Sequence, residues 1–332
     1  MKLVCVSKPI KLREKKSSDN VHLFTQYFIP SNKHRHDELK KCLKLNALNR
    51  DVYKIHLLVE RTYTISELGT SSDKIIQTVI GKRLTFQEVF MYIRTNRIRG
   101  YLILLNSDIC FASTALINLK RSELHIKKQA LALLRYEYNW TEPTNSVIFG
   151  PRFDSQDTWI FHSNYIIPSN AEKIFNFEYG RPGCDNKIIY LMAILGYDVI
   201  NDPQCIQTYH IHHSKQRSYS MKDSLQLPCG VVIPSGIDPR SIKSNLGINM
   251  KEVYHSTKGF TEIMFSDNKI LFDYIQQKID ANQSFILPRI SGIENNVAIF
   301  TRVIRDKLHG DIEPLKTYIK KTLGAMKNNA GI

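Results

Sequence analysis

The short apolar run Tyr101–Leu105 constrains the fold of this chain more than any other feature. Gly100 precedes the run, and the polar residues Asn106, Ser107 and Asp108 follow it at once. Five apolar residues between such boundaries are typical of a strand buried on both faces, as in a parallel α/β sheet. Ligands of such sheets gather where the strands end. The sequence thus predicts Asp108 at a position where chemistry is common, although capping a turn or helix is the plainer interpretation of an isolated aspartate.

Strands and helices alternate along the chain. Strands are expected at 21–29, 53–60, 74–80, 101–105, 130–135, 158–163, 197–200 and 207–213. Amphipathic or capped helices are expected at 37–49, 85–95 and 185–195. This alternation predicts an α/β fold in which helices flank a mostly parallel, mixed sheet.

The composition changes after residue 223. The segment 224–248 contains three prolines and several glycines, which is typical of a linker. We therefore expect one domain over 1–223, a linker over 224–248, and a smaller C-terminal α/β region over 249–332. Within that region a helix is expected at 268–280 and a strand at 284–287.

The chain is basic, with a formal net charge of +15 over 332 residues. This charge favours anionic partners, namely nucleic acid, a membrane surface or the phosphates of a small ligand. The basic residues are spread out and form no Lys/Arg-rich helix, so we expect no nucleic-acid partner. Six cysteines without a CxxC pair, no apolar run of membrane-spanning length and no signal peptide predict a cytoplasmic protein without a transmembrane segment.

Two stretches contain candidate metal ligands. Asn106 and Asp108 are two residues apart, so in an extended backbone both face the same ligand. A carboxylate with an amide oxygen suits Mg²⁺ or Mn²⁺. His210 and His212 share one face of the expected strand at 207–213, and imidazole is a common metal ligand, although surface histidines are the simpler interpretation.

Two further aspartates are candidates for acid–base chemistry. A loop with two glycines and a proline brings Asp185 to the first turn of the helix at 185–195, where it either caps the helix or acts as a general base. Asp157 either caps the following segment or faces a substrate hydroxyl, with Trp159 stacking on a sugar. Lys82 and Arg83 follow the third expected strand and either reach a diphosphate or are solvated charges.

These motifs together resemble the GT-A-fold glycosyltransferases. The resemblance lies in NSD at 106–108 in place of the family's DxD motif, in GRPGCDNKIIYLMAILGYDV at 180–199, and in YHIHH at 209–213. The combination NSDI, SQDTWIF, GCDN and HIHHS resembles more closely a group of sugar transferases encoded by large DNA viruses of algae, among them the N-terminal domain of a chlorella-virus rhamnosyltransferase. Residues 285–298 resemble the start of a different glycosyltransferase fold, which would make the C-terminal region the beginning of a second transferase module.

The resemblance implies an inverting hexosyl- or deoxyhexosyltransferase. Such an enzyme would move a sugar from a nucleotide sugar, with UDP favoured, to a hydroxyl of a glycan or glycoprotein acceptor. Asp108 would bind Mn²⁺ or Mg²⁺, and His210 or His212 would complete its coordination. Asp185 would take the proton of the acceptor hydroxyl, and Asp157 is the competing base or an acceptor ligand.

The resemblance also implies a set of donor-binding residues. These are Phe24, Gln26, Tyr27, Lys82, Arg83, Asn106 and Ser107. Asn106 departs from the family pattern, because an amide supplies no charge, and the metal site should therefore depend more on the late histidine. Two alternatives are a metal-dependent hydrolase or nuclease that uses Asp108 with His210, His212 and His213, and a basic nucleic-acid-binding protein.

Overall fold

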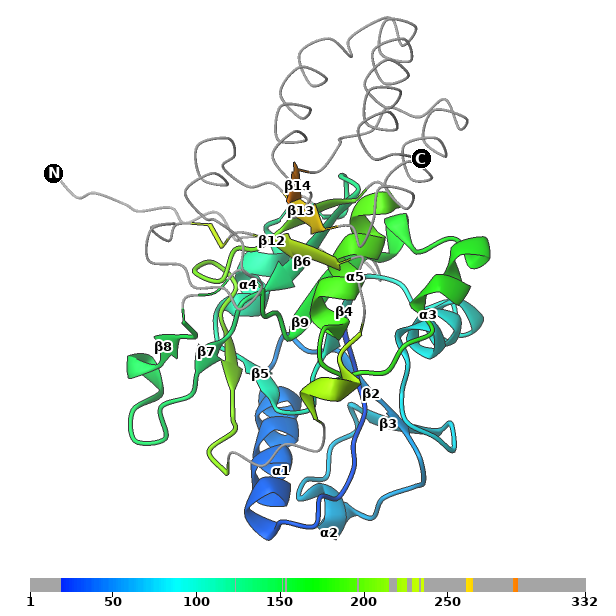
Figure 1. The fold of residues 1–332 in the computed structure, drawn as a ribbon. Coiled ribbons are helices and arrows are strands. Elements are labelled where there is room, and N and C mark those ends of the chain that lie inside the picture. Colours follow the sequence, from blue (N-terminus) through cyan, green and yellow to red (C-terminus); the bar gives the residue numbers. More distant parts are fainter. Residues whose placement is uncertain are drawn as a thin grey trace, which may run out of the picture.

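A seven-stranded sheet forms the centre of the computed structural model, which describes residues 19–122, 124–150, 152, 154–195, 197–214, 220–225, 229–232, 234–235, 261–264 and 289–291 (Figure 1). Its strand order is β10-β6-β9-β4-β1-β2-β3. Strand β9 is antiparallel to both of its neighbours, and all other pairs are parallel. The strands are β1 (Val21–Thr25), β2 (Lys54–Val59), β3 (Ile75–Val79), β4 (Tyr101–Leu105), β6 (Gln129–Leu133), β9 (Thr158–His162) and β10 (Asp198–Ile200). The predicted fold class, a mostly parallel mixed sheet, is confirmed.

Helices cover both faces of this sheet. Helices α1 (Lys33–Leu48) and α4 (Ala115–Lys120) pack on one face, and α3 (Phe86–Thr95) and α5 (Cys184–Ile194) pack on the other. Strand β4 supplies both cores, because Ile103 faces α1 and α4 while Leu102 and Leu104 face α3 and α5. The short helix α2 (Ile65–Leu68) follows β2. The prediction of a strand buried on both faces at 101–105 is therefore confirmed. None of the helices in the described part of the chain has the length and apolar character of a membrane span.

Two smaller sheets extend this core. The first has the order β5-β11-β7-β8 and consists of β5 (Ile109–Phe111), β11 (Thr208–His210), β7 (Tyr136–Glu137) and β8 (Val147–Ile148). The second consists of β12 (Cys229–Val232), β13 (Thr261–Met264) and β14 (Arg289–Ser291). The first small sheet matters for the site, because β5 continues the chain directly after β4 and the polar triplet.

Part of the segment predicted as a linker is a strand. Strand β12 lies against α5, where Asn186 donates a hydrogen bond to the carbonyl of Gly230 at 3.1 Å. A Cβ at Gly230 would lie 2.8 Å from the backbone nitrogen of Tyr190, so only glycine allows this close approach. The helix expected at 268–280 and the strand expected at 284–287 lie outside the described residues.

Helix α1 begins four residues before the predicted start at residue 37. The side chain of Asn32 accepts a hydrogen bond from the backbone N–H of Arg35 at 3.2 Å and so caps the helix. Correspondingly, the first strand ends at Thr25 and does not reach residue 29. The earlier helix start places Arg35 in the first turn of α1.

Two buried histidines face each other across β1 and β2. His22 Nδ1 and His56 Nε2 are 3.0 Å apart, and His56 Nδ1 lies 3.1 Å from the hydroxyl of Tyr92. Burial lowers the pKa of His22 to about 4 and that of His56 to about 3. The unfolded chain thus binds protons at a higher pH than the folded protein does. Stability from this pair is complete above the ordinary histidine pKa of 6.5 and is lost as the pH falls towards about 4.

We therefore predict a smaller pH dependence of stability in a His56→Phe variant. Removing one titrating imidazole should reduce the drop in the urea-denaturation midpoint between about pH 7 and about pH 4.5. His22 loses its imidazole partner in the variant, so the difference between the two curves reports the His22–His56 pair. Parallel curves for wild type and variant would contradict this account.

Candidate functional site

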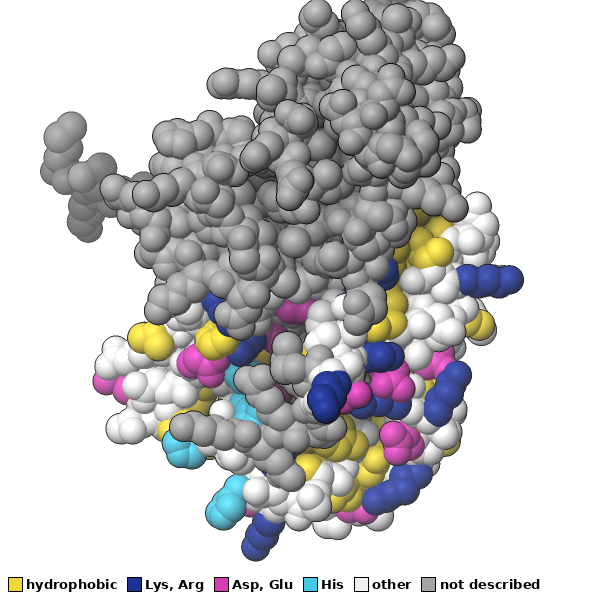
Figure 2. All heavy atoms as spheres, viewed as in Figure 1, with side chains coloured by type: hydrophobic (Ala, Val, Ile, Leu, Met, Phe, Trp, Pro, Cys, Tyr) yellow, Lys and Arg dark blue, Asp and Glu magenta, His cyan; other side chains and the backbone are white. Residues whose placement is uncertain are grey.

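Asp108 lies where the large sheet passes into the first small sheet. The carbonyl of Asp108 accepts a hydrogen bond from the backbone N–H of Ile211 at 2.9 Å, and His210 pairs with Ile109 across the antiparallel strands β5 and β11. This register brings both His210 and His212 to Asp108, although they lie about a hundred residues later in the chain. Figure 2 shows histidine side chains next to acidic and basic ones in the middle of this face.

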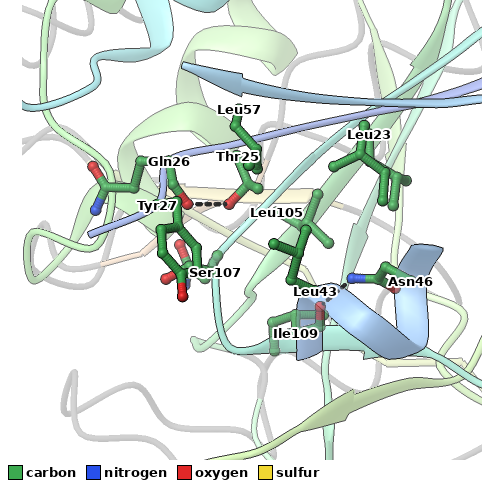
Figure 3. Close-up of a pocket in the computed structure, with 12 residues that line it drawn as sticks. Leu23, Thr25, Gln26, Tyr27, Leu43, Asn46, Leu57, Leu105, Ser107 and Ile109 are labelled. Carbon is green, nitrogen blue, oxygen red and sulfur yellow. Dashed lines mark hydrogen bonds between the residues drawn. The ribbon is translucent and has the colours of Figure 1, made fainter. Parts of the chain in front are cut away.

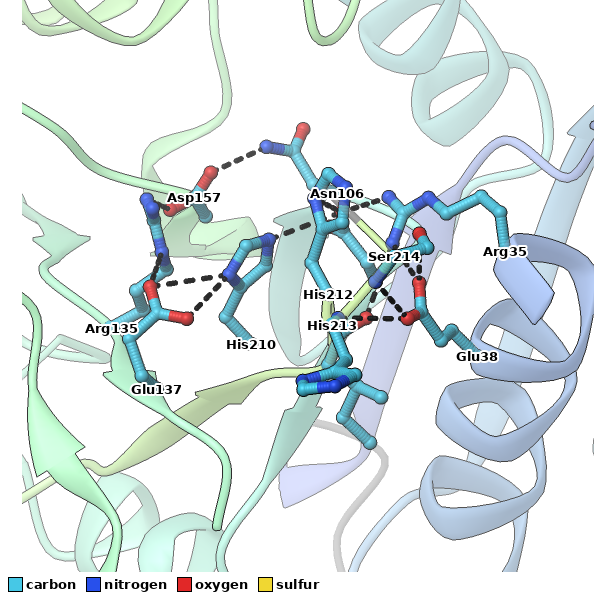
Figure 4. Close-up of polar contacts among 12 residues, drawn as sticks. Arg35, Glu38, Asn106, Arg135, Glu137, Asp157, His210, His212, His213 and Ser214 are labelled. Carbon is cyan, nitrogen blue, oxygen red and sulfur yellow. Dashed lines mark hydrogen bonds and ion pairs between the residues drawn. The ribbon is translucent and has the colours of Figure 1, made fainter. Parts of the chain in front are cut away.

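Three positively charged or protonatable groups converge on one carboxylate oxygen of Asp108. The guanidinium of Arg35 donates to Oδ2, His210 Nε2 lies 3.3 Å from it, and His212 Nδ1 lies 3.9 Å from it. Figure 4 labels the side chains of Arg35, His210 and His212. Burial raises the pKa of Asp108, but His210 and Arg35 outweigh burial and hold the pKa far below its ordinary value. Asp108 is therefore a buried anion rather than an exposed turn residue.

The same residues form a candidate metal site. One ligand atom each from Asp108, His210 and His212 lie within 4.8 Å of one another. His212 Nδ1 lies 3.9 Å from Asp108 Oδ2, and His212 Nε2 is buried without a hydrogen-bond partner among the described residues. One carboxylate and two imidazoles suit a divalent transition metal, so the three predicted metal ligands fit the role.

Glu137 sets the orientation of His210. The two residues are register partners on β7 and β11, and the Glu137 carboxylate lies 3.1 Å from His210 Nδ1. This contact turns Nε2 towards Asp108, as outer carboxylates do for metal-binding histidines. Burial lowers the pKa of His210, but Asp108 and Glu137 outweigh burial and raise it to about 9. A metal ion would therefore replace a proton on His210.

Buried Arg135 connects this cluster to Asp157. Its Nε donates to Glu137 at 3.0 Å, and its terminal NH1 donates to Asp157 Oδ2 at 2.5 Å. The amide of Asn106 donates to Asp157 Oδ1 at 2.7 Å, so each oxygen of this carboxylate already has a donor. Asn106 is thus turned towards Asp157, whereas the sequence suggested that it would share a metal with Asp108.

Asp185 has a different environment from Asp157. It lies in the first turn of α5, after a loop in which Gly180 and Gly183 adopt φ values of 66° and 80°. Its Oδ2 accepts one backbone N–H, from Gln156, at 3.3 Å. Burial and the negative charge of Asp157 raise the pKa of Asp185 to about 7. Asp185 therefore titrates near neutral pH, which suits a general base.

Four of the predicted donor-binding residues line one pocket at the carboxyl ends of β1 and β4. They are Gln26, Tyr27, Asn106 and Ser107, and Figure 3 shows the side chains of Gln26, Tyr27 and Ser107 close together. The rest of the lining is mainly apolar and includes Leu43 of α1. Ser107 and Ile109 of the lining flank Asp108 in the chain, but the side chains of Asp108, His210 and His212 do not line this pocket.

The other predicted donor-binding residues lie elsewhere. Phe24 is fully buried and stacks on His56, with ring centroids 4.7 Å apart, because strand alternation turns it to the face of the sheet covered by α3. Lys82 pairs with Glu88 at 2.6 Å, and Arg83 donates to the carbonyl of Tyr179 at 3.1 Å. None of these three lines the pocket described here.

Trp159 lies in the hydrophobic core of the protein. The indole is fully buried and packs edge-to-face on Phe86, with ring centroids 5.1 Å apart. Its strand β9 is paired on both sides, by β4 and β6. The interpretation that Trp159 stacks on a sugar beside Asp157 is therefore wrong.

Four charged residues of the site were not predicted from the sequence, namely Arg35, Glu38, Arg135 and Glu137. Glu38 of α1 is buried and accepts hydrogen bonds from the backbone N–H groups of His213 and Ser214, at 2.8 and 2.7 Å. It thereby holds residues 210–214, called the histidine segment below, against α1. The capping signal at Asn32 could have placed Arg35 and Glu38 one turn apart on one helix, but no local signal links them to residues 211–214.

No protein-family model and no curated protein sequence matches the chain. Among solved structures, a 4-diphosphocytidyl-2C-methyl-D-erythritol synthase is 12% identical with a TM-score of 0.36, over 62% of this chain and 95% of that protein. The mannosyltransferase PcManGT from Pyrobaculum calidifontis, in complex with GDP-Man and Mn²⁺, is 11% identical with a TM-score of 0.39. That likeness covers 60% of this chain and 58% of the mannosyltransferase. Neither likeness assigns a role to a residue of this chain.

We predict that His212→Ala weakens Mn²⁺ binding by at least about tenfold, because it removes a ligand nitrogen from the cluster. His213→Ala is the matched control, since the neighbouring His213 is exposed and its side chain is outside the cluster. Isothermal titration with MnCl₂ measures both affinities. Equal affinities of the two variants would contradict the assignment.

Proposed function

We propose that this protein is a metal-dependent, inverting glycosyltransferase of the GT-A type. It moves a sugar from a nucleotide sugar, with UDP as the favoured nucleotide, to a hydroxyl of a glycan or glycoprotein. The observation that supports this most is the Asp108, His210 and His212 cluster at the end of β4, beside the pocket that contains Gln26 and Tyr27. Ligand sites of such sheets lie at the carboxyl ends of the strands.

In this proposal Asp108, His210 and His212 hold Mn²⁺, because two imidazoles suit a transition metal better than Mg²⁺, the other ion that the resemblance implied. The bound ion supplies positive charge that stabilises the diphosphate of the leaving nucleotide. Gln26, Tyr27, Asn106 and Ser107 would contact the donor from the walls of the adjacent cavity, which at about 10 Å³ is itself only large enough for one water molecule. The hydroxyl of Tyr27 is fixed by donation to the carbonyl of Glu67 at 2.7 Å, so its ring forms a rigid wall.

Asp185 is the general base of the proposed reaction. It takes the proton of the acceptor hydroxyl as the hydroxyl oxygen attacks the anomeric carbon and the nucleoside diphosphate leaves from the opposite side. A pKa near 7 favours this role, and the hydrogen-bond partners given for Asp185 are backbone N–H groups, those of Gln156 and Asn186, with no cationic side chain among them. Asp157 is the weaker candidate, because Arg135 and Asn106 already occupy its two oxygens. Its proposed role is to position Asn106 and to raise the pKa of Asp185.

The remaining predictions from the sequence stay predictions. They are the resemblance to viral sugar transferases, the cytoplasmic location, and the division into a transferase domain, a linker and a second transferase module. The alternative function, a metal-dependent hydrolase or nuclease, would use the same metal ligands. Only the substrate that the protein turns over distinguishes it from a glycosyltransferase.

We predict Mn²⁺-dependent release of UDP from a UDP-sugar, and a loss of at least about 100-fold in Asp108→Ala, because the variant lacks the charged metal ligand. A coupled assay for UDP measures the rate. Asp73→Ala serves as a control, since this aspartate lies in the loop before β3. Turnover or thermal stabilisation with DNA, and none with any nucleotide sugar, would contradict the proposal.

We predict that Asp185→Asn keeps donor binding and lowers transfer by about 10²- to 10⁴-fold, the usual contribution of a general base. The wild-type rate should rise with pH and level off above about 7, because the base must lose its proton first. Calorimetry with UDP and initial rates at several pH values measure the two effects. Retained transfer in Asp185→Asn, together with its loss in Asp157→Asn, would move the base to Asp157.

A further inference from the structure

Arg35 occupies the carboxylate oxygen that a metal ion would use. It donates to Asp108 Oδ2, the same atom that lies 3.3 Å from His210 Nε2 and 3.9 Å from His212 Nδ1. The side chains of Arg35 and Asp108 are only 10% and 12% exposed. A permanent positive charge therefore lies inside the candidate metal site.

Arg35 has partners that do not depend on Asp108. Its NH1 donates to Glu38 Oε2 at 2.9 Å and to the carbonyl of Ile211 at 3.2 Å. Glu38 in turn holds the backbone of the histidine segment through His213 and Ser214. Arg35 can thus lose its contact with Asp108 while Glu38 remains its counter-charge.

Asp108 Oδ2 is the atom that a metal ion and the Arg35 guanidinium would have to share. A buried carboxylate without a cation is costly, so Asp108 needs a partner whenever no metal is bound. A divalent ion beside the Arg35 guanidinium would suffer strong repulsion, because screening is weak in a buried site. The shared oxygen makes the two cations alternatives.

We propose that Arg35 is the resident counter-ion of Asp108, and that a divalent cation binds Asp108, His210 and His212 in competition with it. This inference rests on the metal site of the proposed function. It explains how the cluster stays folded and neutralised without metal. It also makes Arg35 the residue that sets how weakly the metal binds.

The test compares Arg35→Met with wild type by titration with MnCl₂ and by thermal unfolding with and without MnCl₂. Arg35→Met should bind Mn²⁺ at least about tenfold more tightly, because the competing charge is gone. It should melt lower than wild type without Mn²⁺ and gain more in melting temperature when Mn²⁺ is added. Arg94→Met is the matched control, since Arg94 pairs with buried Glu172 away from the cluster, and its Mn²⁺ affinity should equal that of wild type.

The outcomes separate this inference from the proposed function. Equal or weaker Mn²⁺ binding by Arg35→Met, with clear binding by wild type, overturns the competition and leaves the proposed function standing. Binding by Arg35→Met alone supports the competition and overturns metal dependence of the wild-type enzyme. Absence of binding by both proteins overturns both.

A second variant keeps the test valid if Arg35→Met does not fold. Arg35→Lys retains a positive charge, but a single ammonium cannot reproduce the fork that contacts Glu38, Ile211 and Asp108 together. Its Mn²⁺ affinity should therefore lie between those of wild type and Arg35→Met. An affinity at or below that of wild type overturns the competition.

Discussion

The buried carboxylate of Asp108 is the group on which the rest of the site depends. It lies between two sheets, and its charge is balanced by Arg35 from α1 and His210 from β11. A buried anion is tolerated only with such partners. One carboxylate therefore holds together α1, the end of β4 and the histidine segment. A ligand bound to Asp108 would affect the contacts of all three.

A continuous series of charged and polar contacts runs outward from Asp108. It contains Glu38, Arg35, Asp108, His210, Glu137, Arg135, Asp157 and Asn106. Asp157, near one end of the series, is paired with Arg135, whereas the partners given for Asp185 are the backbone N–H groups of Gln156 and Asn186. This contrast distinguishes the two carboxylates that the sequence left as rival bases. Asp157 is neutralised by its neighbours, and Asp185 has a pKa of about 7.

The fold and part of the site followed from local patterns. Tyr101–Leu105 predicted a doubly buried strand, which is confirmed. Asp108 follows its polar end, between Ser107 and Ile109 of the pocket lining, and its role stays a prediction. The spacing of His210 and His212 brought both to one partner. Arg35 was missed, because Asp108 lies 73 residues away and only the register of β5 and β11 brings the two together with the histidines. Phe24 was misplaced because the residues on both faces of β1 look alike in sequence. The face that carries Phe24 packs in the core against α3.

Diffraction from crystals soaked in MnCl₂ tests the central claim most directly. The account predicts an anomalous difference peak from manganese within coordination distance of Asp108, His210 and His212, with the Arg35 guanidinium turned away from Asp108 and retained by Glu38. A manganese peak at another place, or a fully occupied Arg35–Asp108 ion pair at saturating MnCl₂, would contradict it.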